Sequence, residues 1–174
     1  MELQAARSDS RTIFREHAAF AWRALRRLGV PERDADDVCQ EVFLVVHRKL
    51  AEFEGRSTLR TWVYGICVRS ASAYRRRAVH REIATEHVPE GRTERGQDDE
   101  LADKQARALL DAALDTLDDD KRAVFVLFEI EQLSMADVAE AVGCPLQTAY
   151  SRLHAAREKM QGAIRRGTLE RRLP

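Results

Sequence analysis

Residues 134–157 read SMADVAEAVGCPLQTAYSRLHAAR, and this stretch decides how the rest of the chain is interpreted. Ser134, with Asp137 three residues later, is a variant of the capping box that starts a helix. Gly143 favours the left-handed turn that ends that helix, and Pro145 suits the first turn of another. The stretch therefore predicts two short helices joined by a tight turn, which is the helix-turn-helix arrangement.

The second of these helices carries polar and basic side chains at its start. In a helix-turn-helix the first turns of the second helix meet base edges in the DNA major groove, while basic residues hold the backbone. The side chains placed for these two tasks are Gln147, Thr148, Ser151, Arg152, Arg157 and Lys159. A plain helical hairpin with a solvated basic face is the alternative, because the motif has only loose sequence constraints.

A second stretch with recognisable chemistry covers residues 57–77, STLRTWVYGICVRSASAYRRR. Trp62, Arg69 and Arg76 recur every seven residues and therefore share one stripe of a predicted helix. An aromatic ring among arginines suits single-stranded nucleic acid, because a base stacks on the ring while guanidinium groups hold the phosphates. The alternative is that Trp62 and Tyr64 belong to the core and the arginines are merely solvated. Two basic segments in one chain favour nucleic-acid binding.

The remaining sequence reads as helical, without sustained strand alternation. Apolar spacing predicts helices at about 12–28, 34–50, 58–81, 104–117 and 121–131. Asp34 is expected to be the N-cap of the second helix, and Ser57 or Thr58 that of the third. Residues 84–104 are polar, with one Pro and two Gly, which is typical of a linker.

These elements predict an all-α fold of two small helical domains, residues 1–83 and 105–174, joined by a flexible acidic linker over 84–104. Charge follows a similar division, although the formal net charge of the chain is zero. Residues 1–82 hold 16 Lys/Arg and 11 Asp/Glu, residues 83–120 hold 4 and 12, and residues 121–174 hold 9 and 6. Two basic blocks around an acidic middle suit two anion-binding modules.

Several classes of protein are disfavoured by the same sequence. No apolar run approaches the roughly 20 residues that cross a bilayer, and nothing resembles a signal peptide, so we expect a cytoplasmic protein. Cys39, Cys67 and Cys144 are odd in number and far apart, which argues against disulfides and zinc ligation and for small buried side chains. No phosphate loop, metal-spaced cluster or nucleophile elbow occurs, so we expect no catalytic site, metal or cofactor, and no enzyme.

Two segments together resemble one protein family. Residues 34–77, from DADDVCQEVF to AYRRR, resemble region 2 of bacterial RNA polymerase sigma factors of the extracytoplasmic-function (ECF) group. Residues 117–160, from LDDDKRAVF to AAREKM, resemble region 4 of the same group. The resemblance implies a transcription initiation factor that binds RNA polymerase core, recognises the −10 and −35 promoter elements and helps to melt the DNA. It assigns the first predicted domain to region 2 and the last to region 4.

The resemblance also implies roles for individual residues. Those expected at the β′ clamp of the polymerase core are Asp37, Gln40 and Glu41. Those expected at the −10 element, where a base leaves the stack, are Phe53, Arg56, Ser57, Arg60, Trp62, Arg69 and Arg76. Those expected at the −35 element are Gln147, Thr148, Tyr150, Ser151, Arg152, His154 and Arg157.

The resemblance has departures and one further consequence. Family members usually carry a basic residue where this chain has Tyr150, and often at Phe128 and Ala155, so fewer phosphate contacts and a shallower salt dependence are expected. Such factors are commonly held inactive by an anti-sigma protein, often in the membrane, and we expect one to wedge between the two domains and hold this chain at the inner membrane. A stand-alone DNA-binding regulator that uses only the helix-turn-helix is the alternative function.

Overall fold

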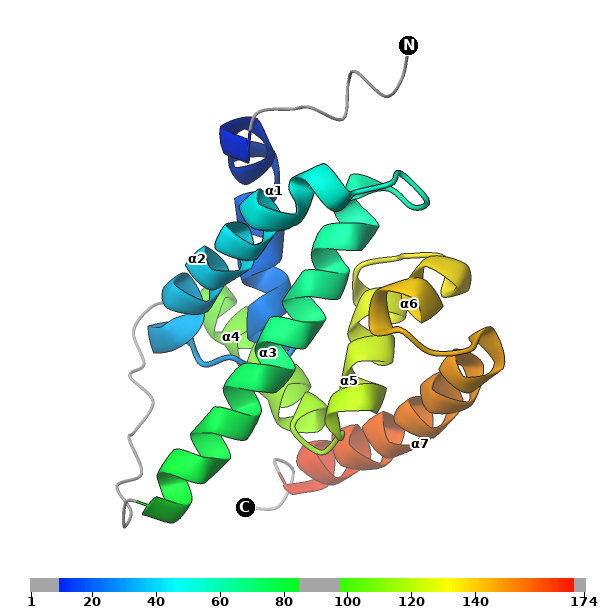
Figure 1. The fold of residues 1–174 in the computed structure, drawn as a ribbon. Coiled ribbons are helices and arrows are strands. Elements are labelled where there is room, and N and C mark those ends of the chain that lie inside the picture. Colours follow the sequence, from blue (N-terminus) through cyan, green and yellow to red (C-terminus); the bar gives the residue numbers. More distant parts are fainter. Residues whose placement is uncertain (1–9, 85–97, 171–174) are drawn as a thin grey trace.

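The computed structural model describes residues 10–84 and 98–170, with side chains over 11–79 and 105–167 (Figure 1). The described residues form helices only, which confirms the all-α prediction. None of these helices is both long enough and apolar enough to cross a membrane.

The first unit consists of α1 (Ser10–Arg27), α2 (Glu32–Lys49) and α3 (Leu59–Ala84), with a short 3₁₀ turn at Leu50–Glu52. Its three helices pack around buried side chains at helical spacing, among them Leu25, Val42, Val46, Val63 and Ile66. Burying large apolar side chains of this kind contributes about 1.5–3 kcal/mol each relative to exposure. This apolar packing places the exposed faces of α2 and α3 side by side.

The starts of α2 and α3 test two predicted caps. Thr58 is confirmed as the cap of α3, because its Oγ1 accepts the Thr61 N–H at 3.1 Å. The prediction of Asp34 as the cap of α2 is wrong. The helix begins at Glu32 after Pro31, whose φ of −64° suits a helix start. The Asp34 carboxylate instead accepts a hydrogen bond from the Tyr74 hydroxyl of α3, so a partner distant in sequence takes the side chain away from a capping role.

The second unit consists of α4 (Asp98–Leu114), α5 (Asp119–Phe125), a π-helical segment at Val126–Ile130, α6 (Met135–Val142) and α7 (Leu146–Glu170). The helix predicted to begin at 104 begins at Asp98. Residues 85–97 of the predicted linker lie outside the described residues.

Local signals define the other helix ends of this unit. Asp118 caps α5 by accepting the Lys121 N–H at 3.0 Å, so this helix starts two residues before the predicted position. Ser134 Oγ accepts the Asp137 N–H at 3.2 Å, and Gly143 ends α6 with φ at 69°. The helix, tight turn and helix predicted for this stretch are therefore present as α6 and α7.

The two units lie against each other along α3 and α6 (Figure 1). Their buried side chains form one continuous apolar cluster. Along this contact, a Cβ added to Gly65 of α3 would lie 3.1 Å from the carbonyl oxygen of Ala141 in α6. Glycine at this position therefore permits a backbone approach that a side chain would obstruct.

Candidate nucleic-acid interface

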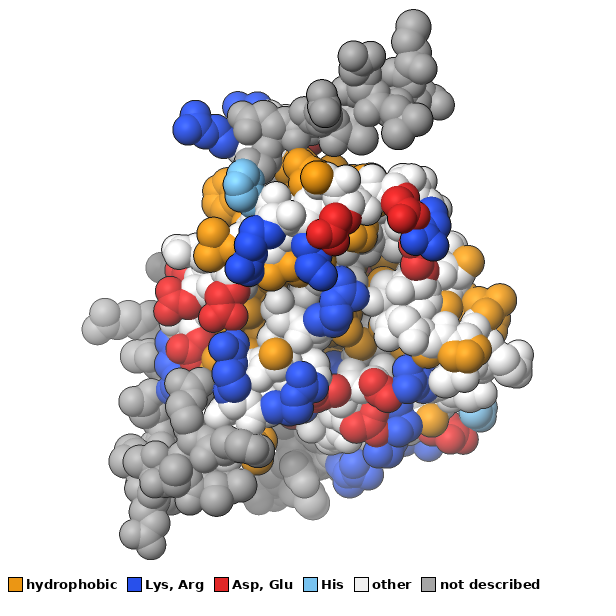
Figure 2. Space-filling view, viewed as in Figure 1, with side chains coloured by type: hydrophobic (Ala, Val, Ile, Leu, Met, Phe, Trp, Pro, Cys, Tyr) orange, Lys and Arg blue, Asp and Glu red, His pale blue; other side chains and the backbone are white. Residues whose placement is uncertain are grey.

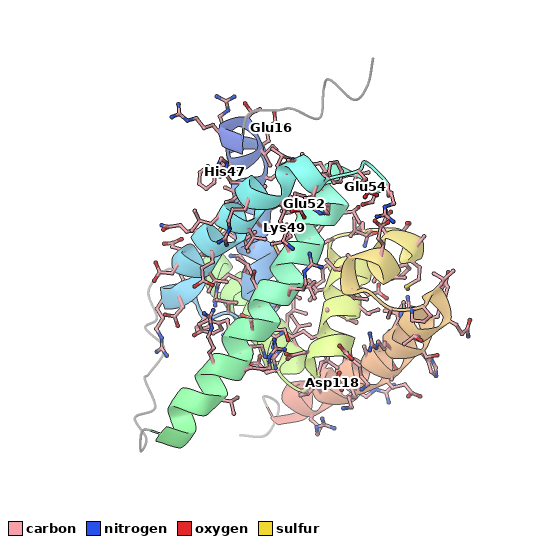
Figure 3. The ribbon with its side chains drawn as sticks, in the orientation of Figure 1. Glu16, His47, Lys49, Glu52, Glu54 and Asp118 are labelled. Carbon is pink, nitrogen blue, oxygen red and sulfur yellow. The ribbon has the colours of Figure 1, made fainter. Side chains whose placement is uncertain are left out.

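A pocket of about 320 Å³ opens where the loop before α3 meets the start of that helix. Its wall contains Phe53, Arg56, Ser57 and Trp62, which are four of the residues predicted to meet the −10 element. The rings of Phe53 and Trp62 lie 5.2 Å apart with planes tilted by 45°. Glu52 and Glu54, labelled in Figure 3, belong to the same wall. Trp62 is half-buried, so part of its ring is available to a ligand.

Arg60, which lies between Ser57 and Trp62 in the sequence, is directed toward α1 and the second unit. Its guanidinium lies 5.5 Å from the Phe20 ring centre and 5.6 Å from that of Tyr64. It donates to the Tyr64 hydroxyl at 3.3 Å and forms a 3.7 Å ion pair with Glu131 of the second unit. The hydrogen bond with Tyr64 raises the pKa of Arg60. Tyr64 itself is fully buried, which agrees with the core interpretation for that residue.

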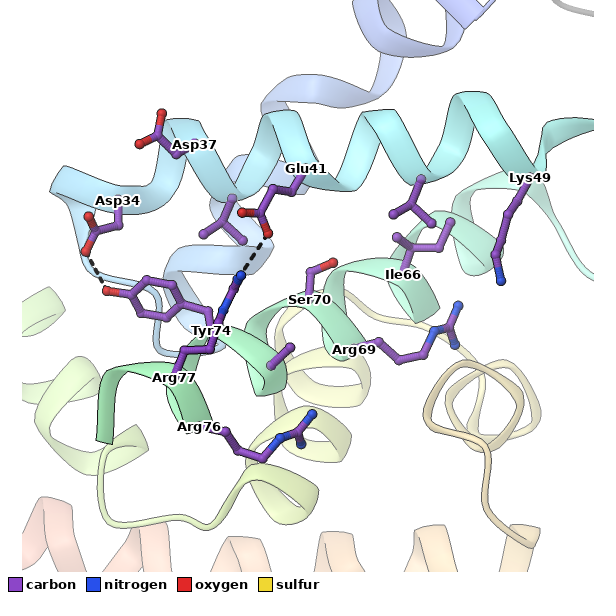
Figure 4. A pocket seen from close by; sticks show the side chains of 13 residues that line it. Asp34, Asp37, Glu41, Lys49, Ile66, Arg69, Ser70, Tyr74, Arg76 and Arg77 are labelled. Atoms are coloured by element: carbon purple, nitrogen blue, oxygen red, sulfur yellow. Dashed lines mark hydrogen bonds and ion pairs between the residues drawn. The ribbon is translucent and has the colours of Figure 1, made fainter. Parts of the chain in front are cut away.

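Arg69 and Arg76 continue the stripe on the exposed side of α3. Both line a groove of about 1140 Å³ between α2 and α3, together with Asp37 and Glu41 (Figure 4). In Figure 2, basic side chains follow α3 across this face and acidic side chains lie beside them over α5. Partial burial lowers the pKa of Arg69.

The residues predicted to meet polymerase lie on the exposed face of α2. Asp37, Gln40 and Glu41 are all exposed. Glu41 accepts a hydrogen bond from Arg77 of α3 at 3.1 Å, which ties the two walls of the groove together. Asp37 lines the same groove, whereas Gln40 lies outside it.

The start of α7 presents most of the residues predicted for the −35 element. The exposed ones are Gln147, Tyr150, Ser151 and His154, and Thr148 is half-buried. Leu146, which sequence reasoning did not single out, is also 48% exposed. Figure 2 shows apolar side chains gathered over the turn between α6 and α7. The tip of the helix-turn-helix therefore combines polar groups with an apolar contact surface.

The two arginines of this surface are held by carboxylates of their own unit. Arg152 pairs with Asp120 of α5. Arg157 pairs with Glu129 at 2.6 Å, and its guanidinium lies 5.7 Å from the Phe128 ring centre. These pairs lie partly in solvent, where ion pairs of this kind contribute about 0.2–1 kcal/mol. Phosphates can therefore displace the carboxylates at small cost.

Two buried charged residues, Glu131 and Arg122, were not predicted. The Glu131 side chain is 8% exposed and pairs with Arg27 of α1 at 2.6 Å. It also accepts a hydrogen bond from the Tyr64 hydroxyl. Burial, and then the hydrogen bond to Glu131, raise the pKa of Tyr64. Glu131 follows residues 123–130, AVFVLFEI, which are apolar apart from Glu129. A carboxylate directly after such a segment is the one sequence feature that could have indicated a buried charge.

Arg122 forms the other buried connection. Its Nε donates to the Arg27 carbonyl at the end of α1 at 2.6 Å, and its Nη1 to Asp115 at 2.7 Å. Burial lowers the pKa of Arg122. The second unit thereby satisfies a C-terminal carbonyl of a helix in the first.

The cysteines match their predicted role in two of three positions. Cys39 and Cys67 are buried and Cys144 is half-buried. Burial raises the pKa values of the Cys39 and Cys67 thiols. Among the described residues, no group of three His, Cys, Asp or Glu side chains is arranged to hold a metal ion.

Comparison with known proteins matches both units. The family model for Sigma-70 region 2 matches residues 13–81, and that for Sigma-70, region 4 matches residues 107–160. The ECF RNA polymerase sigma-E factor of Haemophilus influenzae is 31% identical over 145 residues, covering 78% of this chain and 77% of that protein. The ECF sigma-E factor of Escherichia coli K12 is 31% identical over 151 residues, covering 79% of each.

Two solved structures share the arrangement of helices. The structure of CnrH in complex with the cytosolic domain of CnrY has a TM-score of 0.67, with 25% identity over 92% of both chains. The sigma factor RpoE of Bartonella quintana, in complex with the anti-sigma factor NepR, has a TM-score of 0.68 and 23% identity, covering 90% of this chain and 97% of that one.

A three-helix unit with a basic α3, followed by a helix-turn-helix unit, defines a transcription factor of the Sigma-70 class with regions 2 and 4. Within that class, the chain belongs to the ECF group of RNA polymerase sigma factors. The first unit is hereafter called region 2 and the second region 4.

Proposed function

We propose that this protein binds RNA polymerase core, directs it to promoters by recognising the −10 and −35 elements, and helps to open the DNA. The observation that carries the proposal is the aromatic pocket of Phe53 and Trp62 beside the basic stripe of α3, in one chain with an exposed helix-turn-helix. A duplex-reading helix and a single-strand pocket are the two devices that promoter recognition and melting require.

The −10 step uses the pocket at the start of α3. Taking a base out of the stack costs a few kcal/mol, and base–aromatic stacking returns about 1–3 kcal/mol. Trp62 supplies the stacking surface, and Phe53 and Ser57 complete the wall. Arg56 belongs to the same wall, where it pairs with Glu54 at 2.7 Å, while Arg69 and Arg76 continue along α3 to hold the strand. Arg60 joins them once it leaves Glu131.

The −35 step uses the first turns of α7 in the major groove. Gln147, Tyr150, Ser151 and His154 face solvent there, with Thr148 partly covered. Arg152 and Arg157 exchange their carboxylate partners for phosphates. Because Tyr150 and Ala155 are uncharged where related proteins often have basic residues, contact of this helix with duplex DNA depends more on shape and apolar area than on charge.

Contact with polymerase uses the acidic face of α2. Asp37, Gln40 and Glu41 are exposed along it and suit a basic partner such as a surface of the β′ clamp. Residues 1–83 and 105–174 are proposed as the two DNA-binding domains, with 84–104 as the linker that runs through the polymerase. The end of this linker, from Asp98, is helical and belongs to α4.

Control by an anti-sigma factor is part of the same proposal. The similar RpoE structure is a complex with an anti-sigma factor. A partner of this class would hold the present chain away from polymerase and, where it is itself a membrane protein, keep this cytoplasmic chain at the inner membrane.

The test is transcription in vitro with purified core polymerase and fragmented genomic DNA, followed by sequencing of the transcripts. We expect transcripts that start downstream of a shared pair of sequence elements, and none from core alone. Binding to core is measured in parallel by size-exclusion chromatography. Absence of both specific transcripts and core binding would rule out the proposal, whereas tight operator binding without polymerase would favour a stand-alone regulator.

A further inference from the structure

A pocket of about 420 Å³ lies where the turn between α1 and α2 meets α3, the end of α4 and α5. It shares Tyr74 with the groove between α2 and α3 and no lining residue with the aromatic pocket. Of the described residues that line it, none is proposed above to contact polymerase or promoter DNA. We call it the arginine pocket, because its wall includes four arginines beside two aspartates: Arg26, Arg33, Arg75, Arg122, Asp111 and Asp115.

Two of the arginines converge deep in this pocket. Arg122 is the most buried of the four, with 4% of its side chain exposed. A Cβ added to Gly29 would lie 3.1 Å from both Arg122 Nη1 and Arg75 Cδ, and φ of Gly29 is +98°. Glycine therefore leaves the space in which the two arginines meet. Burial lowers the pKa of Arg122, and the neighbouring charge of Arg75 acts in the same direction.

Arg75 has a hydrogen-bond donor that the chain does not satisfy. Its Nη1 lies 2.9 Å from Asp119 Oδ1, yet it is buried and no described residue accepts a hydrogen bond from it. The contact with Asp119 is thus an ion pair whose direction does not suit a hydrogen bond. Buried donors in native proteins nearly always have an acceptor. The position of Arg75 therefore calls for an acceptor from outside the chain.

The two aspartates of the wall balance the arginines only in part. Asp115 accepts a hydrogen bond from Arg122 Nη1 at 2.7 Å, and the charge of Asp111 also favours the charged form of Arg122. Four positive and two negative side chains give the wall a formal charge of +2. A ligand with two or more negative charges complements such a wall.

Arg26 and Arg33 flank the turn between α1 and α2 and are more accessible. Arg26 donates to the Val30 carbonyl at 2.8 Å. The Arg33 side chain is 67% exposed and lies 3.5 Å from the Asp34 carboxylate, which also accepts from Tyr74 (Figure 4). Partly solvated contacts of this kind are weak, so both arginines can turn to an entering anion at small cost.

We propose that the arginine pocket binds a small molecule with a diphosphate group, of the kind that nucleotides carry. Guanidinium groups match phosphate oxygens through paired hydrogen bonds. Arg75 and Arg122 hold the inner phosphate, and Arg26 and Arg33 hold the outer one. The volume of about 420 Å³ falls in the range of small-molecule pockets, about 300–1,000 Å³, and exceeds what a single phosphate needs.

The depth of the pocket favours a small ligand over nucleic acid. Arg122 is nearly covered, and the phosphates of duplex DNA lie on a wide convex surface that does not reach such a group. The wall also comes from both regions, with Arg75 on α3 and Arg122 on α5. A ligand that binds the folded chain in this way raises its stability by mass action.

The experiment titrates sodium pyrophosphate into the purified full chain by isothermal calorimetry, without divalent cations and with the ionic strength held constant by sodium chloride. Orthophosphate is the comparison. We expect one site per chain, binding of pyrophosphate at least tenfold tighter than of orthophosphate, and a higher unfolding temperature in pyrophosphate at the same ionic strength. Equal affinities for the two anions, or no binding of either, would overturn the proposal.

Arg75→Gln tests the buried donor. We expect pyrophosphate binding about tenfold weaker or more, because one charge-assisted contact is lost. Arg48→Gln removes the same charge from an exposed position of α2 outside the pocket and is the matched control. It should stay within about 1.5-fold of wild type, the size of a diffuse charge effect. Equal weakening by both variants would mean that the anion is attracted by overall charge and not by this pocket.

Asp111→Asn tests the same pocket in the opposite direction. Removing one negative charge from the wall should tighten pyrophosphate binding about threefold or more. Glu158→Gln, at an exposed position of α7, makes the same change in net charge and should have little effect. General damage to the fold cannot tighten binding, so this variant decides the matter even if Arg75→Gln lowers the helical circular dichroism. Weaker or unchanged binding in Asp111→Asn would contradict the assignment.

A competition separates a small ligand from DNA. Single-stranded and duplex oligonucleotides without terminal phosphates are added in excess before the pyrophosphate titration. We expect the pyrophosphate affinity to stay within about twofold at constant ionic strength, because the promoter-reading residues lie outside this pocket. Loss of pyrophosphate binding, together with weaker oligonucleotide binding in Arg75→Gln, would assign the pocket to DNA and overturn the proposal. Since no polymerase or transcription is involved, the outcome does not depend on the function proposed above.

Discussion

The two surfaces proposed to read DNA differ in what neutralises their arginines. On α7, Arg152 and Arg157 pair with Asp120 and Glu129, which belong to region 4 itself. On the proposed −10 surface, Arg60 meets Glu131 of region 4, and Arg27 of α1 pairs with the same carboxylate. Pairs within a region can exchange partners by side-chain rotation, whereas pairs between regions exchange only if the regions separate. Arg60 is therefore the residue of the proposed −10 surface that region 4 holds, while Arg56, Arg69 and Arg76 stay exposed.

This difference suggests an order of events. On this view the helix-turn-helix meets duplex DNA with local rearrangement of Arg152 and Arg157, while Arg60 holds a strand only after it leaves Glu131. Four substitutions test the contrast, from the largest expected effect to the smallest.

Trp62→Ala should have the largest effect, because it removes the stacking surface of the pocket. Loss of a base–aromatic stack of about 1–3 kcal/mol corresponds to roughly 5- to 150-fold weaker promoter opening. Permanganate reactivity of the −10 strand measures opening, and core affinity should be unchanged. An equal loss of opening and core affinity would assign Trp62 to the core of region 2 instead.

Arg122→Met should lower the free energy of unfolding by about 2 kcal/mol, since it deletes hydrogen bonds to the Arg27 carbonyl and Asp115 while keeping much of the side-chain volume. Urea unfolding at neutral pH measures the change. Arg107→Met, at an exposed position of α4, is the control and should stay within about 0.5 kcal/mol of wild type. Equal values for both variants would mean that the α1 cap contributes nothing.

Tyr64→Phe should change the pH dependence of stability. The pKa of Tyr64 is raised in the folded chain by burial and by Glu131, so the unfolded chain loses this proton first. Stability from the neutral hydroxyl is full below the unfolded pKa of about 10 and falls as pH rises above it, by up to about 1.4 kcal/mol per pH unit. Unfolding measured between pH 9 and roughly 11 should show a shallower decline in Tyr64→Phe than in wild type. Identical slopes would contradict the buried position of the hydroxyl.

Arg152→Ala should have the smallest effect, because one phosphate contact is lost from an exposed surface. The slope of log binding constant against log salt for duplex DNA should fall in magnitude by about 0.9. Fluorescence anisotropy with holoenzyme and a −35 duplex measures it. The core affinity should not change, and a loss of helical content would show that Arg152 has a structural role.

Local chemistry made much of region 4 predictable. Ser134 and Gly143 act within one turn of their own position, through a side chain that accepts a nearby N–H and a backbone that tolerates positive φ. Thr58 was identified for the same reason. Asp34 shows where the reasoning failed, since it has every property of a cap but bonds to Tyr74, 40 residues away.

The candidate site divides in the same way. Residues near one another in sequence, such as Phe53, Ser57 and Trp62, were grouped by sequence and do line one pocket. That Glu140 joins them was not predictable, because it lies on another helix far along the chain. The roles of all these residues in DNA binding stay predictions that the variants above test.

The amino-acid sequence by itself determined which segments are helical and where α3 begins and α6 begins and ends, because these properties arise from interactions within a few residues. Only the tertiary structure decided that Glu131 would be buried between Arg27, Arg60 and Tyr64, and that Gly65 would face Ala141. The type of a charged residue does not specify which distant residue it will pair with. Its partner is decided by how whole helices pack, and that packing joins region 2 to region 4 through buried charges.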